Sequence, residues 1–254
     1  AFMDVDYVIH AAALKQVPTA EYNPIETIKT NIIGAQNVIE ASLKTRVKKV
    51  LALSTDKASS PINLYGATKL CSDKLFIAAN NIKGKKDLSF SIVRYGNVTG
   101  SRGSVIPHFL ETKKQGFLEI TDKRMTRFNI TLRESIQMVD WAFKNSIGGE
   151  ILVPKISSYR ILDLAKAISP NSNLKFTGIR PGEKLHEELL NSGESFNTYE
   201  TKNYYIILPN DKKKYKDFYE KKLKAKKVKK GFSYQSDQNT FLTLQQLKKL
   251  LKNY

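Results

Sequence analysis

The stretch VKKVLALSTDKASSPINLYGATK, Val47 to Lys69, decides the predicted fold. Its apolar run ends in two hydroxyl residues and predicts a buried strand, while NLYGATKLCSDKLFIAAN, residues 63–80, predicts a helix. The preceding residues repeat this order, since VDYVIHAAA (residues 5–13) predicts a strand buried on both faces and residues 23–45 predict a helix. LSFSIVRYGNV, residues 88–98, predicts a third strand. This alternation predicts a parallel sheet with crossover helices, hence a doubly wound α/β fold.

Beyond residue 100 the predicted elements are shorter and mixed, which indicates a smaller α+β lobe that closes over the sheet. Apolar spacing predicts helices over residues 105–115, 132–146, 160–168 and 182–192, and strands over residues 149–154 and 173–179. Residues 212–230 are expected to form a linker or an exposed helix, and TLQQLKKLLKNY predicts a last helix that begins at Thr243. We therefore expect three parts, at residues 1–100, 101–210 and 211–254.

Charge and composition limit the class of protein. The 254-residue chain carries a formal net charge of +18, which in principle suits a polyanion. Eleven lysines lie between Lys212 and Lys230, so a solvated lysine-rich surface is the preferred interpretation, and we expect no nucleic-acid partner. There is no run of eighteen apolar residues to span a membrane. A single cysteine, Cys71, favours a reducing compartment, and the predicted location is cytoplasmic.

Two residues of the predicted second helix are suited to proton transfer. Tyr65 and Lys69 are four residues apart, so both project from one helix face near its N-terminus. A tyrosine can act as a base only if its pKa falls from about 10 toward about 7. A neighbouring ammonium and an oxidised nicotinamide can together lower it that far. A Tyr and a Lys at this spacing are common by chance, so the proton-transfer interpretation depends largely on the residues that precede them.

A second pair of titratable side chains follows the preceding strand. Thr55 ends that strand with a hydroxyl within reach of a substrate and of the tyrosine, and Asp56 and Lys57 come next. An acid and a base held there over one substrate could move protons in both directions. Ligands of parallel sheets bind at the carboxyl ends of the strands. The loops AAALK (residues 11–15), STDK (residues 54–57) and GNVTGSRG (residues 96–103) are therefore predicted to face one crevice.

Together these motifs resemble a known enzyme family. A strand ending in Ser-Thr and followed by Y-x-x-x-K is similar to the extended short-chain dehydrogenase/reductases. The finer pattern resembles the inverting UDP-N-acetylglucosamine 4,6-dehydratases of polysaccharide biosynthesis, through HAAALKQVP (residues 10–18), VRYGNVTGSRGSVIP (residues 93–107), ITDKRMTRF (residues 120–128) and GIRPGEKLHE (residues 178–187). The resemblance implies a Rossmann-like NADP-binding sheet for residues 1–100 and a substrate-binding lobe with interleaved Rossmann elements for residues 101–210.

The resemblance also implies a reaction. Tyr65, helped by Lys69, would take the proton from O4 of UDP-N-acetylglucosamine while hydride leaves C4 for NADP. Lys57 would then abstract the C5 proton as Asp56 protonates the departing 6-hydroxyl. Dehydratases that keep the C5 configuration typically have Asp-Glu at this place, so Lys57 predicts inversion. We expect Lys69 and the oxidised cofactor to lower the pKa of Lys57 and free its neutral form.

Further positions acquire expected roles from the resemblance alone. Lys15 would contact the substrate near the reacting sugar, and Asn97 its diphosphate or sugar. Arg127 and Arg180 would hold the pyrophosphate, and Glu183 the uridine ribose. The expected cofactor-binding residues are Ala11, Leu53, Ser54, Tyr65, Lys69, Val98 and Arg102. No metal is expected, because the three histidines are scattered.

The product would be a UDP-4-keto-6-deoxy-L-arabino-hexose for surface glycans or flagellin sugars of the pseudaminic acid type, made by a homo-oligomer. Complete members open with a G-x-G-x-x-G turn that cradles the cofactor pyrophosphate, and this motif is absent here. The resemblance implies about 70 to 80 further residues before Ala1, which hold the first strands. We expect this fragment to fold poorly and to bind NADP weakly by itself, because half a parallel sheet exposes an apolar edge.

Two alternatives stay open. A related UDP-sugar epimerase would use the same tyrosine but would need no acid and base for eliminating water, so Asp56 and Lys57 discriminate against it. A catalytically inactive protein that binds sugar nucleotides or polyanions is the other alternative. The intact Tyr65 and Lys69 argue against it.

Overall fold

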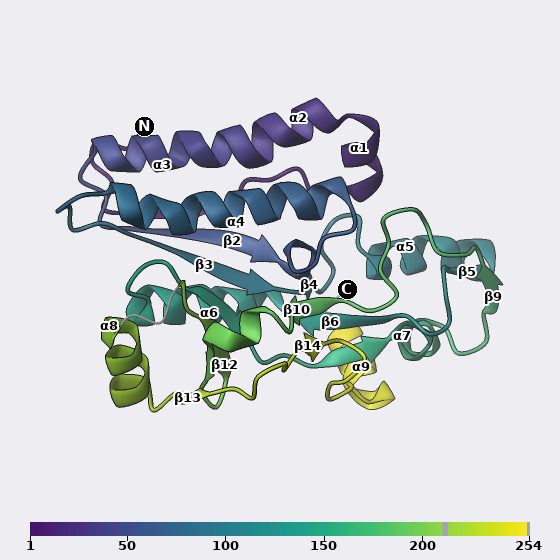
Figure 1. Ribbon diagram of the computed structural model, residues 1–254. Helices are drawn as coiled ribbons and strands as arrows, with labels where there is room; N and C mark the ends of the chain where they lie inside the picture. The colour runs from purple at the N-terminus through teal and green to yellow at the C-terminus, as the bar shows by residue number, and fades with distance from the viewer. Residues whose placement is uncertain (210–212, 253–254) are drawn as a thin grey trace.

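The computed structural model describes residues 1–209 and 213–252 and is built around a seven-stranded sheet in the order β1-β2-β3-β7-β12-β11-β13 (Figure 1). The first four strands are parallel, and the remaining three continue the sheet in antiparallel fashion. The predicted doubly wound α/β fold is therefore confirmed. The strands are β1 Tyr7–His10, β2 Lys49–Thr55, β3 Ser89–Tyr95, β7 Ile151–Pro154, β12 Tyr204–Ile207, β11 Thr198–Glu200 and β13 Lys226–Lys227.

Helices cover both faces of this sheet. On one face lie α4 (Leu64–Ile82) and a continuous helical run made of α2 (Pro24–Ile28), η1 (Lys29–Ile33) and α3 (Gly34–Lys44), as Figure 1 shows. The short α1 (Val17–Tyr22) leads into this run, and α6 (Leu132–Asn145) covers the other face. Successive strand residues point to opposite faces. Accordingly, Val50 packs with the α3 and α4 core, whereas Leu51 packs with the core beneath α6.

Strand β1 differs from the prediction, because only one of its faces is buried. Val8 packs with Ile39 of α3, but Tyr7 is 61% exposed and Ile9 is 52% exposed. The strand lies at the edge of the sheet, and on its other face Tyr7 meets the edge of Phe143 of α6, with ring centroids 5.8 Å apart. An apolar run of this kind cannot by itself show whether a strand is central or at an edge.

The smaller lobe has its own core and small sheets. Phe109 of α5, Leu118 of β5 and Leu164 of α7 are buried together there, with Leu247 of α9 against them. The predicted Thr243 start of the last helix is confirmed by a capping box with Gln246, while residues 253–254 lie outside the described part of the chain. The elements are β4 Asn97–Val98, α5 Val105–Thr112, η3 Lys113–Gln115, β5 Phe117–Ile120, β6 Thr126–Ile130, β8 Ser158–Arg160, α7 Ile161–Ile168, β9 Asn173–Phe176 and α9 Leu244–Leu251.

Residues 182–192 do not form the predicted helix. They form a turn and then strand β10 (Glu188–Leu190), which pairs antiparallel with β14 (Tyr234–Gln235) and leads into η4 (Glu194–Asn197). The spacing of Leu185 and Leu189 mimics a helix. Pairing with a strand more than forty residues later in the chain decides the outcome instead, which local periodicity cannot reveal.

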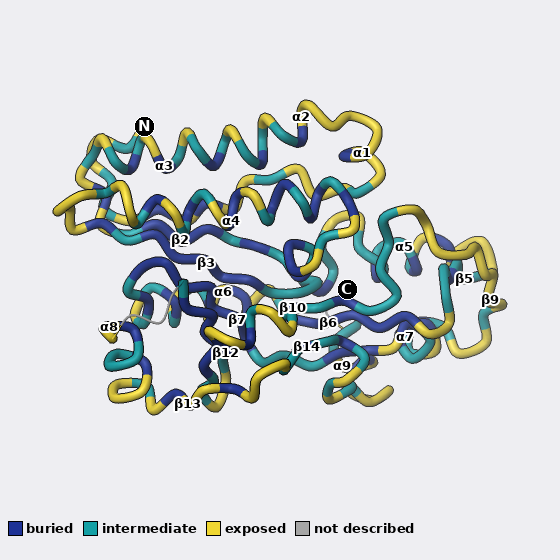
Figure 2. The backbone as a smooth tube through the Cα atoms, viewed as in Figure 1, coloured by how far each residue is buried: buried dark blue, intermediate teal, exposed yellow. Residues whose placement is uncertain are grey.

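The lysine-rich segment is also more integrated than predicted. It forms α8 (Lys213–Lys216), η5 (Asp217–Lys222) and β13, whereas Lys212 lies outside the described residues. Figure 2 shows buried stretches between exposed ones along this segment. Its described lysines are exposed except for the half-buried Lys216, whereas Tyr215 and Tyr219 are buried against the core beneath α6. The Tyr215 hydroxyl donates to the Gly148 carbonyl at 2.7 Å. The segment is therefore a packed edge of the main sheet.

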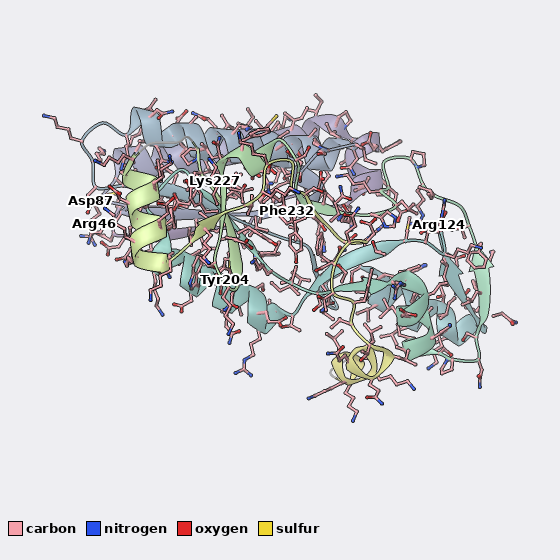
Figure 3. The ribbon with its side chains drawn as sticks, turned by 60° about the horizontal axis from the view of Figure 1, so that its bottom comes forward. Arg46, Asp87, Arg124, Tyr204, Lys227 and Phe232 are labelled. Carbon is pink, nitrogen blue, oxygen red and sulfur yellow. The ribbon has the colours of Figure 1, made fainter. Side chains whose placement is uncertain are left out.

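No helix within residues 1–209 and 213–252 combines the length and the apolar character needed to cross a bilayer. Figure 3 shows Arg124 on the smaller lobe, at the opposite end of the molecule from Arg46 and Asp87. Arg46 precedes β2 and Asp87 precedes β3, so they mark the end of the sheet where these parallel strands begin. The carboxyl ends of the strands face the lobe, where a ligand site is expected.

Candidate active site

A cavity of about 660 Å³ lies at the carboxyl ends of β1, β2 and β3. The three loops that the sequence predicted to face one crevice all line it. The predicted residues on its wall are Ala11, Lys15, Leu53, Ser54, Thr55, Asp56, Lys57, Tyr65, Lys69, Asn97, Val98, Arg102 and Arg180.

A second cavity, of about 260 Å³, lies against the smaller lobe. It shares Lys57, Asn97 and Arg180 with the first, and its wall contains the two remaining predicted residues, Arg127 and Glu183. The structure therefore gathers every candidate residue around two adjoining cavities.

Helix α4 begins at the site and positions Tyr65 and Lys69. Asn63 caps it by accepting a hydrogen bond from the Gly66 amide at 2.8 Å, and its own amide donates to the Gly182 carbonyl at 2.7 Å. A Cβ atom on Gly66 would lie 2.2 Å from the Lys57 carbonyl oxygen. This close approach holds the start of the helix directly against the loop that bears Asp56 and Lys57.

The pKa of Tyr65 is raised in the protein by itself. Burial raises it to about 12, and the positive charge of Lys57 and a hydrogen bond with Thr55 only partly oppose this effect. Lys69 is buried and donates to the Leu53 carbonyl at 2.8 Å, and burial lowers its own pKa. Without a cofactor, burial therefore outweighs the positive charge near the phenol.

The Lys57 ammonium is held between two carboxylates. Its Nζ lies 3.1 Å from Asp56 Oδ1 and 3.0 Å from Glu187 Oε1. Burial alone would lower the pKa of Lys57, but Asp56 and Glu187 together raise it above its ordinary value. In the protein by itself the direction is thus opposite to the one expected with a cofactor bound, because Glu187 adds a second negative neighbour.

The two carboxyl groups respond to burial in opposite ways. Asp56 is fully buried and also accepts from the Thr55 hydroxyl at 2.9 Å. Burial raises its pKa, and Lys57 offsets only part of that rise. Burial would raise the pKa of Glu187 too, but Lys57 and Arg127 lower it below the ordinary value. The site therefore pairs a carboxyl whose pKa is raised with one whose pKa is lowered.

Three charged residues that the sequence argument did not use lie beneath the site. Asp73 of α4 accepts from the Ser54 hydroxyl at 2.8 Å and lies 3.5 Å from Arg94 of β3. Arg94 is fully buried and pairs with Glu194 at 2.9 Å. Asp73 follows Lys69 by four residues, so one helix face carries Tyr65, Lys69 and Asp73. That spacing was the available signal for Asp73.

The predicted phosphate-binding arginines differ in setting. Arg127 is nearly buried, donates to the carbonyls of Thr126 and Leu185, and has Glu183 at 3.5 Å. Arg180 is exposed on the cavity rim. Lys15 is likewise at the rim, where burial and then Lys57 lower its pKa. Its loop is fixed by Asn31, which exchanges hydrogen bonds with the Leu14 backbone at 2.8 and 2.9 Å.

Comparison with known proteins places this site in a family. Residues 1–209 match the family model described as "Polysaccharide biosynthesis protein". The chain is 58% identical over 245 residues to the UDP-N-acetylglucosamine 4,6-dehydratase (inverting) of Campylobacter jejuni, covering 94% of this chain and 73% of that protein. It is 44% identical over 212 residues to a UDP-glucose 4-epimerase of Rickettsia canadensis, covering 82% of this chain and 62% of that protein.

A solved structure agrees with these relatives. The X-ray structure of Pen from Bacillus thuringiensis is 38% identical and superposes with a TM-score of 0.89, covering 99% of this chain and 77% of that one. The resemblance seen in the motifs is therefore confirmed, and the chain belongs to the polysaccharide biosynthesis protein family that includes the inverting UDP-N-acetylglucosamine 4,6-dehydratases.

Proposed function

We propose that the chain carries the proton-transfer residues of a UDP-N-acetylglucosamine 4,6-dehydratase that inverts C5 and uses NADP. One observation carries the proposal: the pair Tyr65 and Lys69 and the pair Asp56 and Lys57 line the same cavity. The first pair suits oxidation at O4, and the second suits removal of water. The Campylobacter jejuni relative is named an inverting UDP-N-acetylglucosamine 4,6-dehydratase, and its 58% identity to this chain supports the same substrate and the same inversion.

The residues of the larger cavity fit a nicotinamide cofactor. Small side chains, Ala11 and Ala13, follow β1 and leave room beside the Lys69 ammonium, which already holds the Leu53 carbonyl. Arg102 adds a second positive charge on the wall. When bound, NADP would accept hydride from C4 of the sugar and return it at C6. These chain residues would bind the cofactor and keep a positive charge near Tyr65.

Tyr65 would take the proton of the sugar 4-hydroxyl. Because burial holds its pKa near 12, the phenol needs positive charge from its surroundings to ionise at neutral pH. Lys57 supplies part of that charge within the protein. Thr55 is hydrogen-bonded to the Asp56 carboxyl, so one hydroxyl links the oxidising pair to the eliminating pair.

Oxidation at C4 acidifies the proton on C5, which Lys57 would abstract. Asp56, whose pKa is raised by burial, would give its proton to O6 and release water. A proton then returns to C5 from the opposite face, which inverts that centre. The product would be a UDP-4-keto-6-deoxy-L-arabino-hexose for a surface glycan or a flagellin sugar of the pseudaminic acid type. The homo-oligomer stays a prediction.

Product analysis with the full-length protein tests this proposal. The protein is incubated with UDP-N-acetylglucosamine and NADP, and the sugar is followed by NMR. The appearance of a C6 methyl group beside a C4 carbonyl is expected. A product that keeps its C6 oxygen would contradict the proposal.

An epimerase is the second candidate, because a relative at 44% identity carries that name. An epimerase needs only the tyrosine pair and would leave Asp56 and Lys57 without a reaction to perform. The burial of Asp56 and its close contact with Lys57 favour the dehydratase. The same NMR experiment separates the two, since epimerisation changes only the configuration at C4.

A further inference from the structure

Glu187 is a buried carboxylate whose oxygen lies 3.0 Å from the amine of Lys57. It precedes β10 in the loop that reaches back toward α4, and it lines the smaller cavity beside Lys57. Its second cationic neighbour is Arg127, with Nε at 3.8 Å. A buried carboxylate with two cationic neighbours stays ionised, which makes it a fixed negative charge within the site.

The C-terminal segment fixes the backbone of Glu187. The Ser236 hydroxyl accepts from the Glu187 amide at 2.9 Å, and the Ser236 amide donates to the Glu187 carbonyl at 2.9 Å. The Ser236 hydroxyl also lies 2.7 Å from the Thr126 hydroxyl. Strand β14 ends just before Ser236 and pairs with β10, which begins just after Glu187. The backbone that carries this carboxylate is thus fixed by Ser236 and by the pairing of β10 with β14, so its place beside Lys57 is built into the fold.

The contacts of Lys57 determine where its lone pair points. A neutral amine has two N–H bonds and one lone pair. Asp56 Oδ1 and Glu187 Oε1 can accept the two N–H bonds, at 3.1 and 3.0 Å, which leaves the lone pair for a third direction. Lys57 lines both cavities, so that direction is available to a bound sugar. With Asp56 as its only partner, the amine could rotate.

The charges of the cluster balance through the elimination. Before the step Lys57 and Arg127 are positive, and Asp56 and Glu187 are negative. Transfer of one proton from Lys57 to Asp56 creates the amine base and the carboxylic acid together. Lys57 then takes the proton from C5, Asp56 gives its proton to O6, and the C6–O bond breaks as the C5–C6 double bond forms. The cluster ends with its starting charges, and Glu187 keeps its own throughout.

We propose that Glu187 is the positioning residue for Lys57, aiming its lone pair at C5 and stabilising the ammonium that forms when the proton is taken. The proposal rests on the proposed dehydratase function. It predicts that Glu187 affects the elimination step and leaves binding of the nucleotide largely unchanged.

The groups that face Lys57 come from several elements, and all of them enter a pH profile. Besides Asp56 and Glu187 they are Lys15, Tyr65, Arg127, Tyr159 and Lys184.

Two substitutions in the full-length protein test the proposal, with a matched control. Glu187→Ala removes both the acceptor and the charge, and Glu187→Gln keeps an acceptor of the same shape without the charge. The control, Glu188→Gln, changes the adjacent carboxylate, which contacts Ser60 and Gln235 on the other side of the strand. Thermal unfolding and UDP binding show whether each variant folds with an intact nucleotide site.

The expected result is a fall of about 100-fold in kcat for Glu187→Ala with UDP-N-acetylglucosamine, the lower end of what a general base contributes, and little change in KM. Glu187→Gln should fall less far, and the rising limb of its kcat profile should move to lower pH because Lys57 loses a negative neighbour. Glu188→Gln should match the wild type. A Glu187→Ala enzyme with the kcat and pH profile of the control would overturn the proposal while the dehydratase function stood.

A second readout does not depend on turnover. Lysine can be incorporated with ¹³C and ¹⁵N in its side chain, which leaves the amine unmodified, and the Lys57 signal is identified by its loss in Lys57→Arg. Its pKa should fall in Glu187→Gln relative to the control. An unchanged Lys57 pKa would overturn the proposal whether or not the wild-type protein forms a dehydrated product. Absence of that product from the wild-type protein would reject the proposed function.

Discussion

The Ser54 hydroxyl donates to Asp73 at 2.8 Å, which joins the end of β2 to the middle of α4. Ser54 precedes the residues of the eliminating pair, and Asp73 lies on the same helix face as the tyrosine pair. Arg94 of β3 completes the link beneath both, with its guanidinium 3.5 Å from Asp73. One buried polar network thus ties together the strand end and the helix that carry the two proposed proton-transfer pairs.

Asp73→Asn should destabilise the protein strongly. The substitution leaves Arg94 with one carboxylate in place of two, and breaking a buried ion pair costs about 3 to 5 kcal/mol of unfolding free energy. Urea unfolding measures the change. The matched control is Asp140→Asn, which breaks an exposed pair with Lys144 and should cost about 0 to 1 kcal/mol. Equal losses of unfolding free energy in the two variants would show that the buried network does not stabilise the protein more than an exposed ion pair does.

Gly66→Ala should separate α4 from the catalytic loop. The new Cβ would lie 2.2 Å from the Lys57 carbonyl oxygen, so the helix start must shift, at a cost of about 1 to 3 kcal/mol. Gly34→Ala, whose Cβ would meet an ordinary contact at 3.7 Å, should be neutral or stabilising by up to about 1 kcal/mol. Thermal unfolding of both variants checks this, and a stable, fully active Gly66→Ala protein would contradict the described packing.

Stability should fall in mildly acidic solution because of His10. Burial, followed by the charge of Lys69, lowers the pKa of this histidine to about 4, so the folded protein holds it neutral. The unfolded chain takes up a proton below about pH 6.5, and stability is therefore lost as pH falls from about 6.5 toward 4. His10→Gln should lose less stability over this window. Urea midpoints at pH 7.5 and pH 5 measure the difference, and parallel losses in both proteins would reject the assignment.

Tyr219→Ala should destabilise the fold although it lies in the lysine-rich segment. The ring is fully buried against the core beneath α6, and loss of a large core side chain costs about 3 to 5 kcal/mol. Lys221→Gln removes an exposed charge from the same segment and should change stability by less than about 0.5 kcal/mol. If chemical unfolding found both variants unchanged, the segment would behave as the solvated tail that its composition suggests.

The sequence predicted strands β1, β2, β3 and β7 of the main sheet, the helices between the first three and the convergence of three loops, because these depend on local apolar patterns and on the rule that parallel strands end at one edge. It failed where distant residues decide. Strands β12, β11 and β13 were not predicted, and the strand at Glu188 needs its partner at Gln235.

The same limit applies to the charge of Lys57. The motifs place Lys57 beside Asp56, but only the folded chain brings Glu187 against it. Glu187 had been assigned to a helix, and no local pattern connects it to a residue 130 positions earlier in the chain. The types of the candidate residues were readable from the motifs, whereas their charge states required the contacts.

Elimination of water by Asp56 and Lys57 with inversion at C5 leaves a mark on the product. The full-length protein is incubated with UDP-N-acetylglucosamine and NADP in deuterated water, and the C5 configuration and deuterium content are determined by NMR. We expect a 4-keto-6-deoxy sugar with deuterium at C5 and the L-arabino configuration. A sugar epimerised at C4 that keeps its C6 oxygen, or a 6-deoxy product with C5 unchanged, would contradict it.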